Sequence, residues 1–339
     1  MTLKEIAKRA EVSVSTVSRV LNGTAKISQP VASRVLDIAR ETGYLDKIKQ
    51  NRSPQSVFSG KQILLVTPRD AVLNQSGNMI SYTLIEALKN LCNEQNIKLG
   101  SLLTQDNQNS VERLKQTLAQ QDYAAIIVVW ADDSALLTTI SEYPIPSILI
   151  NGEDRSMNID SVGFSNRYGA MMAVDYLINH GHQNIGLLSY TGRQTIYLRE
   201  SGYRDSLYNA KIALNSDFHI QCDDYSDIAA EEAVDKWLKA HTNNPVSALF
   251  CVTDGLALGA ISALQKNGLR VPQDVSVIGM DGIFSLDLVE PKLTTIKLPF
   301  EALPSEALRI LESQKMIQKP GNYHLHLELS CELLERDSV

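Results

Sequence analysis

Between residues 63 and 280, short strand-like runs alternate with longer segments of helical periodicity, and this alternation constrains the fold more than any other feature of the chain. The first series predicts strands at 63–66, 98–103, 125–130 and 147–150, separated by helices at 79–95, 111–120 and 134–142. Most of these strands are apolar throughout, so both of their faces must be buried, as in a parallel sheet covered by helices on both sides. We therefore expect an α/β fold.

The same alternation starts again after residue 165. Helices are predicted at 168–180, 196–209, 227–240 and 255–267, alternating with strands at 184–189, 217–220, 248–252 and 275–280. Two such series in one chain predict two lobes. Ligands of such folds bind beyond the carboxyl ends of the strands, so we expect a small-molecule site between the lobes.

The first 42 residues have a different periodicity. They predict three short amphipathic helices, at 3–10, 14–22 and 29–42, with Ser13 as the N-cap of the second helix. Two short helices at a sharp turn, braced by a third, make a helix-turn-helix. Any small three-helix unit gives this apolar pattern, but the exposed face of the second helix is short and polar and carries one arginine. Such a face is suited to contacts with base edges and phosphates. A face exposed only to solvent would instead be rich in Glu and Lys.

The charge distribution also favours DNA binding. Residues 1–60 carry ten Lys and Arg against five Asp and Glu, a net charge of +5, whereas the remainder carries 22 against 34, a net charge of −12. A basic head on an acidic body is the expected electrostatic pattern of a protein whose head alone contacts phosphates.

Composition excludes several classes of protein. The four cysteines are scattered without zinc-ligand spacing, so we expect reduced thiols and no metal centre. No apolar run reaches about 18 residues and none precedes Leu3, so neither a membrane span nor a signal peptide is expected. These features predict a cytoplasmic protein.

The N-terminal run resembles a known family. TLKEIA at 2–7, VS at 12–13 and TVSRVLN at 16–22 are similar to the headpiece of the lactose-repressor/galactose-repressor (LacI/GalR) family of transcriptional regulators. The resemblance implies that Val14, Ser15 and Arg19 face base edges, while Thr16, Ser18, Asn22 and Lys26 contact the DNA backbone. A valine suits a thymine methyl group, and an arginine suits guanine N7 and O6.

The resemblance extends over nearly the whole chain. It is carried by GHQNIG at 181–186, RESGY at 199–203, TDGLALGA at 253–260, GLRVPQDVSVIGMD at 268–281, LTTIK at 293–297 and the closing stretch 332–338. It implies a helix-turn-helix headpiece at 1–44, a linker at 45–60, and a two-lobed periplasmic-binding-protein-like domain at 61–339 that binds an effector and forms the dimer. The first lobe would hold about 61–162 and 296–325, and the second about 163–295 with a late return near the C-terminus.

The resemblance also implies an effector site. Arg199 and Asp281 would grip the ligand as a donor fork and an acceptor, with a structural salt bridge as the alternative. The other positions that match ligand-lining residues, or that end a strand at this site, have plain packing as their alternative: Phe164, Ser165, Tyr225, Thr253, Phe300 and Trp130. Asp254 is expected to cap the helix at 255–267. QSGN at 75–78 replaces an aromatic pair common in the family, which favours a sugar over a purine.

The linker departs from the family pattern. Relatives usually carry a hinge helix whose leucine wedges open the minor groove, whereas this chain reads QNRSP at 50–54. Asn51 or Arg52 remains available to enter a narrow minor groove. We therefore expect less DNA bending here. The alternative function is a sugar-binding sensor with weakened or non-specific DNA binding.

Enzyme chemistry has little support. The paired histidines His180/His182 and His324/His326 lack partners that would complete a catalytic or metal-binding set, and one of the first pair is expected to cap a helix end. We expect no cofactor. The sequence thus predicts a homodimeric regulator that binds a pseudo-palindromic operator and is controlled by a sugar. We expect it to repress transcription rather than activate it. The chain ends without a heptad tail, which favours a dimer over a tetramer.

Overall fold

The computed structural model describes residues 3–22, 28–42, 56–69, 72, 79–104, 109–241, 246–282, 289–316 and 323–339. The side chains of 3, 4, 22, 29 and 79 are not described. The chain divides between Ser59 and Gly60 into two compact units, each of which is described by itself. The predicted linker lies mostly outside the described residues.

The N-terminal unit contains three helices, as predicted: α1 (Leu3–Arg9), α2 (Val14–Asn22) and α3 (Gln29–Glu41). Its core consists of small and branched apolar side chains that recur at helical spacing: Ile6, Ala7, Ala10, Val17, Val35 and Ala39. Ser13 begins α2 as predicted, because its Oγ accepts a hydrogen bond from Thr16 N at 3.1 Å. Pro30 at the start of α3 needs no backbone donor there.

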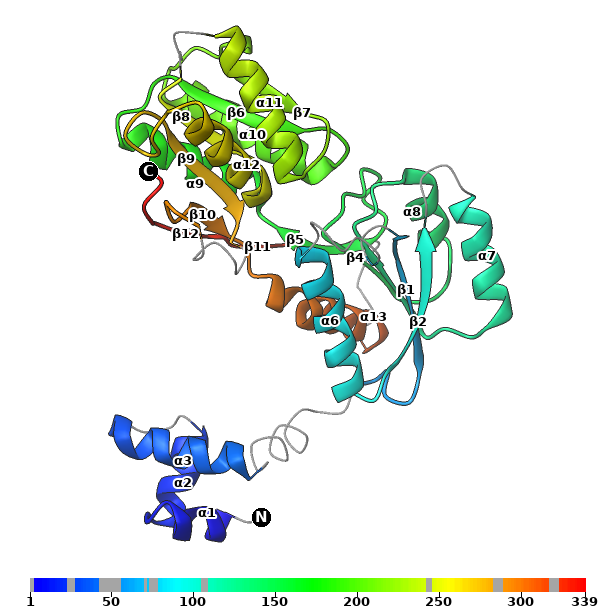
Figure 1. Cartoon of the computed structure of the whole chain (residues 1–339). Helices are drawn as coiled ribbons and strands as arrows, with labels where there is room; N and C mark the ends of the chain where they lie inside the picture. Colours follow the sequence, from blue (N-terminus) through cyan, green and yellow to red (C-terminus); the bar gives the residue numbers. More distant parts are fainter. Residues whose placement is uncertain are drawn as a thin grey trace. The chain divides into compact units, whose positions relative to one another are not determined.

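The second unit contains two parallel-stranded lobes, and its described strands form two six-stranded sheets. The first sheet has the order β11-β5-β4-β3-β1-β2. Its strands are β1 (Gln62–Pro68), β2 (Lys98–Thr104), β3 (Ala125–Val129), β4 (Ser147–Ile150), β5 (Asp160–Phe164) and β11 (His326–Leu329). The helices α6 (Met79–Glu94) and α13 (Leu303–Met316) pack together, and α7 (Ser110–Gln120) packs with α8 (Ser134–Ser141). Figure 1 shows this lobe in blue-green with α13 in orange.

The second sheet repeats this plan with the order β12-β10-β9-β8-β6-β7. Its strands are β6 (Ile185–Tyr190), β7 (His219–Cys222), β8 (Ala248–Cys251), β9 (Ser276–Asp281), β10 (Thr294–Lys297) and β12 (Glu332–Leu334). Its helices pack as two pairs: α9 (Asn166–Asn179) with α10 (Gln194–Asn209), and α11 (Asp227–Ala240) with α12 (Asp254–Lys266). The strands are parallel except for β12, which pairs antiparallel with β10. The predicted α/β architecture with two helix-covered, largely parallel sheets is therefore confirmed.

The chain passes between the lobes three times. The first crossing lies between β5 and α9, the second between β10 and the 3-10 turn Phe300–Ala302, and the third between β11 and β12. Two lobe limits differ from the expected ones by a few residues. Thr294–Lys297 belongs wholly to the second sheet because it pairs with β9, and His326–Leu329 extends the first lobe beyond residue 325 because it pairs with β5.

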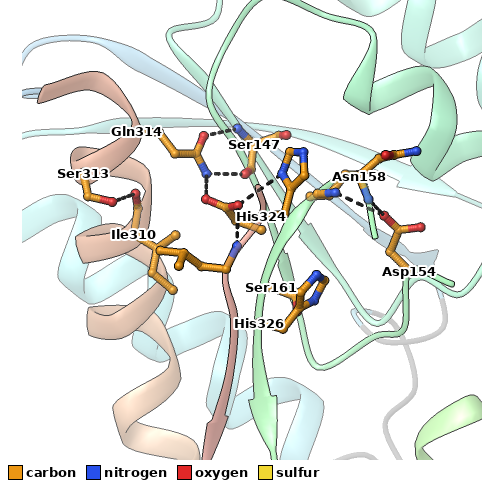
Figure 2. A network of polar contacts seen from close by, with 12 residues as sticks. Ser147, Asp154, Asn158, Ser161, Ile310, Ser313, Gln314, His324 and His326 are labelled. Carbon is orange, nitrogen blue, oxygen red and sulfur yellow. Dashed lines mark hydrogen bonds and ion pairs between the residues drawn. The ribbon is translucent and has the colours of Figure 1, made fainter. Parts of the chain in front are cut away.

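A polar network fixes the amino ends of three first-lobe strands (Figure 2). The Gln314 side chain from α13 exchanges two hydrogen bonds with the Ser147 backbone and donates a third to Asp160 Oδ2 at 2.9 Å. Asp160 is 1% exposed, and its Oδ1 also accepts from Leu325 N and lies 3.2 Å from His324 Nδ1. A buried carboxylate is tolerated when it is fully hydrogen-bonded. The network therefore anchors β11, the strand that arrives last in the sequence.

Candidate functional site

The exposed face of α2 is the candidate DNA-reading surface. Val14 is 41% exposed, and Ser15 and Arg19 are also exposed. The Ser13 hydroxyl lies 2.7 Å from Ser15 Oγ and 2.8 Å from Thr16 Oγ1, so both hydroxyls are held at the start of the helix. Arg19 makes no hydrogen bond or ion pair with any described residue. Its guanidinium and the Val14 methyl groups are thus the groups of this face that are free to meet a partner.

Other predicted DNA contacts are placed only in part. Thr16 and Ser18 are half-buried on α2. Asn22 is the last residue of α2, but its side chain is not among those described. Lys26, Asn51 and Arg52 lie outside the described residues.

Arg199 and Asp281 meet directly at the carboxyl end of the second sheet. Arg199 Nη1 lies 2.9 Å from Asp281 Oδ1, and the two side chains are only 5% and 4% exposed. The guanidinium also donates to the Val252 carbonyl at 2.6 Å and to Asn166 Oδ1 at 2.9 Å. Burial raises the pKa of the Asp281 carboxyl, and the adjacent guanidinium opposes that rise. The structure therefore shows the salt bridge that was the alternative to a ligand grip, and the ligand grip itself stays a prediction.

The Asp281 backbone has a φ of +150°, which side-chain-bearing residues rarely adopt. The next residue, Gly282, has a φ of +74° and donates its N–H to Asp254 Oδ2 at 2.7 Å. Asp254 is completely buried and also accepts from Thr295 Oγ1 at 2.5 Å. Asp254 thus holds the turn after β9 against β10, and this fixes where Asp281 lies.

The expectation that Asp254 caps the following helix was wrong. Thr253 is the N-cap of α12, with its hydroxyl accepting from Leu256 N at 3.3 Å, and Asp254 is the first helical residue. Thr253 was predicted to line the effector site. Its hydroxyl is instead hydrogen-bonded to its own helix in this structure.

Aromatic side chains surround these charged groups. Tyr190 ends β6, and its ring centroid lies 5.9 Å from that of Tyr225. Burial raises the pKa of Tyr190, while the nearby charges of Arg199 and Arg193 oppose that rise. Tyr190 is therefore a neutral hydroxyl beside the Arg199–Asp281 pair. The sequence prediction included Tyr225 and missed Tyr190, although Tyr190 directly follows a predicted strand.

Phe164 and Phe300 come from different crossings and pack edge-to-face, with ring centroids 4.8 Å apart. They are 2% and 9% exposed. At the first crossing, Ser165 Oγ donates to Glu328 Oε2 at 2.9 Å, and Ser165 N donates to the Leu329 carbonyl. These five residues link crossing segments, so any motion of one lobe against the other acts on them.

The carboxyl end of the first sheet carries two residues with left-handed backbones. Trp130, which follows β3, has a φ of +55° and is 7% exposed, and Asn151, which follows β4, has a φ of +49° and is 8% exposed. Backbone strain of this kind concentrates at functional sites.

An ion pair joins this edge directly to the second lobe. Arg193, at the start of α10, places Nε 3.0 Å from Asp132 Oδ2 and donates from Nη2 to the Asn151 carbonyl at 2.7 Å. Asp132 Oδ2 also accepts from Gln194 N at 3.2 Å, and Arg155 Nη2 donates to Gln194 Oε1 at 2.6 Å. We call Arg193, Gln194, Asp132 and Arg155 the interlobe latch.

Comparison with known proteins places the chain. Residues 2–46 match the family "Bacterial regulatory proteins, lacI family", and residues 174–339 match the periplasmic binding protein-like domain. The chain belongs to the LacI family. It is 28% identical over 341 residues to the HTH-type transcriptional repressor PurR of Aliivibrio fischeri, covering all of this chain and 98% of that protein. The predicted class, a transcriptional regulator with a helix-turn-helix headpiece, is thereby confirmed.

Two solved structures share the fold of this LacI-family regulator. A sugar-binding transcriptional regulator of the LacI family from Escherichia coli, complexed with phosphate, aligns with a TM-score of 0.69 and 26% identity, over 83% of this chain and 99% of that one. A lac repressor dimer bound to operator and the anti-inducer ONPF aligns with a TM-score of 0.71 and 24% identity, over 100% of this chain and 98% of that one.

The histidines of this LacI-family regulator have structural partners. His180 Nδ1 lies 2.8 Å from the Tyr176 carbonyl at the end of α9, so His180 is the predicted cap, and His182 contacts Ser247. His326 Nδ1 lies 2.9 Å from Ser161 Oγ. Among the described residues, no group of three or more His, Cys, Asp or Glu is arranged to hold a metal, and no helix is long and apolar enough to cross a membrane.

The sequence prediction missed the groups that act through neighbours. Asn166 orients Arg199, Asp254 positions Asp281, and Arg193 reaches Asp132 across the lobes. Position along the chain was the one signal that could have found part of this set. Asp132 and Asn151 lie just after predicted strands, where side chains gather at the ligand-binding end of such folds.

Proposed function

We propose that this chain is an operator-binding repressor whose DNA affinity is set by a sugar-type effector bound between the carboxyl ends of the two sheets. The observation that carries the proposal is the buried Arg199–Asp281 pair, because a guanidinium fork and a carboxylate together match vicinal hydroxyl groups. Tyr190, Tyr225, Phe164, Phe300 and Trp130 offer aromatic faces for the sugar ring, and Ser165 and Thr253 offer hydroxyls. The similar sugar-binding regulator supports this ligand class.

The headpiece would place α2 in the major groove. In this proposal Val14, Ser15 and Arg19 read bases, whereas Thr16, Ser18, Asn22 and Lys26 contact phosphates. Asn51 and Arg52 would lie at the minor groove. A twofold homodimer requires a pseudo-palindromic operator, and the similar lac repressor dimer on its operator supports this arrangement. The protein would act in the cytoplasm, without enzymatic activity.

Coupling would use the three crossings. An effector that binds both lobes stabilises one relative orientation of the lobes, and a change in that orientation alters how far apart the two headpieces of a dimer lie. In this proposal the closed arrangement is the lobe orientation in which the interlobe latch joins Arg193 to Asp132, so the latch favours closure even before the effector binds. The effector then needs to supply only part of the closing free energy.

One sequence feature favours a second candidate. The linker stretch QNRSP at 50–54 lacks the wedging leucine of the family pattern, which favours a sugar-binding sensor with weak, non-specific DNA binding as the second candidate. In that case affinity for DNA would fall steeply with salt and ignore sequence.

Selection of randomised duplexes by the full-length protein, repeated with a mixture of mono- and disaccharides, tests these candidates. The repressor predicts recovery of a palindrome whose enrichment changes when sugar is added. Arg19→Ala should abolish recovery of that palindrome, while the exposed control Lys115→Ala, on α7, should not change it. Recovery of non-specific DNA alone, with sugar still bound, supports the sensor and contradicts the repressor.

A further inference from the structure

Two buried polar side-chain atoms lack a hydrogen-bond partner in the part of the chain that the structure describes, and both belong to the ligand-facing edge of the first sheet. They are Thr67 Oγ1 and Asn151 Oδ1. Thr67 is the penultimate residue of β1 and is 1% exposed, and Asn151 directly follows β4 and is 8% exposed. Buried acceptors are almost always paired, so these two atoms indicate a donor that is not among the described residues.

Three carboxylates gather at the same edge. Glu153, two residues after Asn151, is half-buried and its carboxylate accepts no hydrogen bond from a described residue. Burial, Asp132 and Glu328 raise the pKa of Glu153, while Arg155 and Arg193 lower it. The loops carrying Asp132 and Glu153 are in contact, since Glu153 N donates to Asp132 Oδ1 at 3.0 Å.

The two arginines beside this group are committed to other partners. Arg193 binds Asp132 and the Asn151 carbonyl, and Arg155 binds Gln194. Glu328 accepts one hydrogen bond, from Ser165. The edge therefore has three carboxylates against two guanidinium groups, a surplus of one negative charge, and Glu153 is the carboxylate without a partner.

At the opposite edge both buried carboxylates are hydrogen-bonded. In the second lobe Asp281 is paired with Arg199, and Asp254 accepts from Gly282 and Thr295. The donors and acceptors of that edge are already paired with one another. Such an edge suits neutral hydroxyl groups of a ligand. The first-lobe edge offers acceptors and negative charge, so the two edges call for different groups on one ligand.

We propose that the effector is an amino sugar or a comparable polyol carrying one ammonium group, which lies at the first-lobe edge against Asn151 and Glu153 while its hydroxyls meet Arg199 and Asp281. This inference rests on the proposed function, a sugar-type effector between the lobes. An ammonium group supplies three donors and one positive charge, which matches the unpaired Asn151 oxygen and the Glu153 carboxylate together. A hydroxyl group in its place supplies one donor and leaves the negative charge uncompensated.

Isothermal titration of the full-length protein near pH 7 tests the proposal with matched sugars: glucosamine, galactosamine and mannosamine, each beside its parent hexose and its N-acetyl form. The N-acetyl form keeps an N–H donor but loses the charge. We expect at least one amino sugar to bind about tenfold more tightly than both of its neutral counterparts, as charge-assisted hydrogen bonds are roughly twice as strong as neutral ones.

Two variants locate the ammonium group. Glu153→Gln should reduce the preference for the amine to less than about threefold, whereas the exposed control Glu142→Gln should retain it. Asn151→Asp adds a carboxylate at nearly unchanged shape, and aspartate tolerates the left-handed backbone, so the preference should grow. Asn151→Asp is expected to increase the preference for the amino sugar, so it still tests the proposal if Glu153→Gln does not fold.

The outcomes separate the two claims. If neutral hexoses bind as tightly as their amino forms, or if neither variant changes the preference, the ammonium site is contradicted while the sugar effector stands. If no sugar of either kind binds while operator recognition is intact, the sugar-type effector itself is overturned, and the amino-sugar proposal falls with it.

Discussion

The two lobes of the effector domain have the same strand order, yet the buried polar groups at the carboxyl edges of their sheets differ in how completely they are hydrogen-bonded. In the second lobe the charged groups are buried and paired, as Arg199 with Asp281 and Asp254 with Thr295. In the first lobe Thr67 and Asn151 each keep an unpaired buried oxygen. A shared strand order thus does not imply equal preparation for a ligand. The second lobe is preorganised, whereas in the proposal above the first lobe receives its missing partners from the ligand.

The largest expected effect comes from removing Arg199, the cation of the buried pair in the second lobe. Arg199→Ala leaves the Asp281 carboxylate buried without its partner, so the free energy of unfolding should fall by about 3–5 kcal/mol and sugar binding should be lost. Chemical denaturation measures the first effect and titration the second. Arg167→Ala is the matched control, because its ion pair with Asp205 is exposed to solvent and should contribute little to stability. Equal losses in the two variants would contradict a preorganised second lobe.

The next effect concerns the interlobe latch. Asp132→Asn weakens contacts from Arg193 and Gln194 that are part-buried, and charged hydrogen bonds of this kind contribute about 1.5–3 kcal/mol. The closed arrangement should therefore become at least about tenfold less populated, and effector affinity should fall in parallel. Small-angle scattering with and without effector reports the closure. Asp122→Asn, an exposed carboxylate in the same lobe, should change neither quantity.

A smaller effect follows from Glu153, whose pKa is raised in the folded protein mainly by burial. A carboxyl with a raised pKa favours the folded state most below the pKa of the unfolded chain, and this advantage is lost as the pH rises through the folded value. Glu153→Gln should consequently raise the melting temperature of the effector-free protein at pH 7. The difference from the parent protein should disappear at a pH below the ordinary glutamate pKa. A variant that is destabilised at pH 7 would show that Glu153 is already well paired.

The smallest effect tests Thr67. Thr67→Val replaces an unpartnered hydroxyl by a methyl group of similar shape, so stability should rise or change by less than about 1 kcal/mol. Thr295→Val is the control in the second lobe, where the hydroxyl donates to buried Asp254 and its loss should cost about 1–3 kcal/mol. If both substitutions destabilise the protein equally, the two edges do not differ in the way described above.

The sequence predicts most strands, and most accurately those that are wholly apolar. The runs at 125–130 and 147–150 appear in the structure as β3 and β4. β5 was not predicted, because Asp160, Ser161 and Gly163 interrupt its apolar pattern, and Asp160 is buried only through partners from distant parts of the chain. β7 begins two residues later than predicted, since Ser216–Phe218 forms a 3-10 turn capped by Asn215.

The candidate site shows the same limit. Arg199 and Asp281 were brought together by the family resemblance, which implied a shared ligand site and left a direct salt bridge as the alternative. Their direct pairing and the Arg193–Asp132 contact depend on how separate elements meet, which periodicity does not encode. Whether these residues and those on α2 bind sugar and DNA stays a prediction.

The three crossings have a consequence for the order in which the protein is made. The first lobe is not complete until β11 at His326–Leu329 has been synthesised, and the second waits for β12 at Glu332–Leu334. The headpiece needs only the first 42 residues and has its own core. Since domains fold as units and N-terminal ones first during synthesis, the helix-turn-helix is finished while both lobes still lack their last strands. The headpiece of a nascent chain therefore exists for a time without the domain that is to control it.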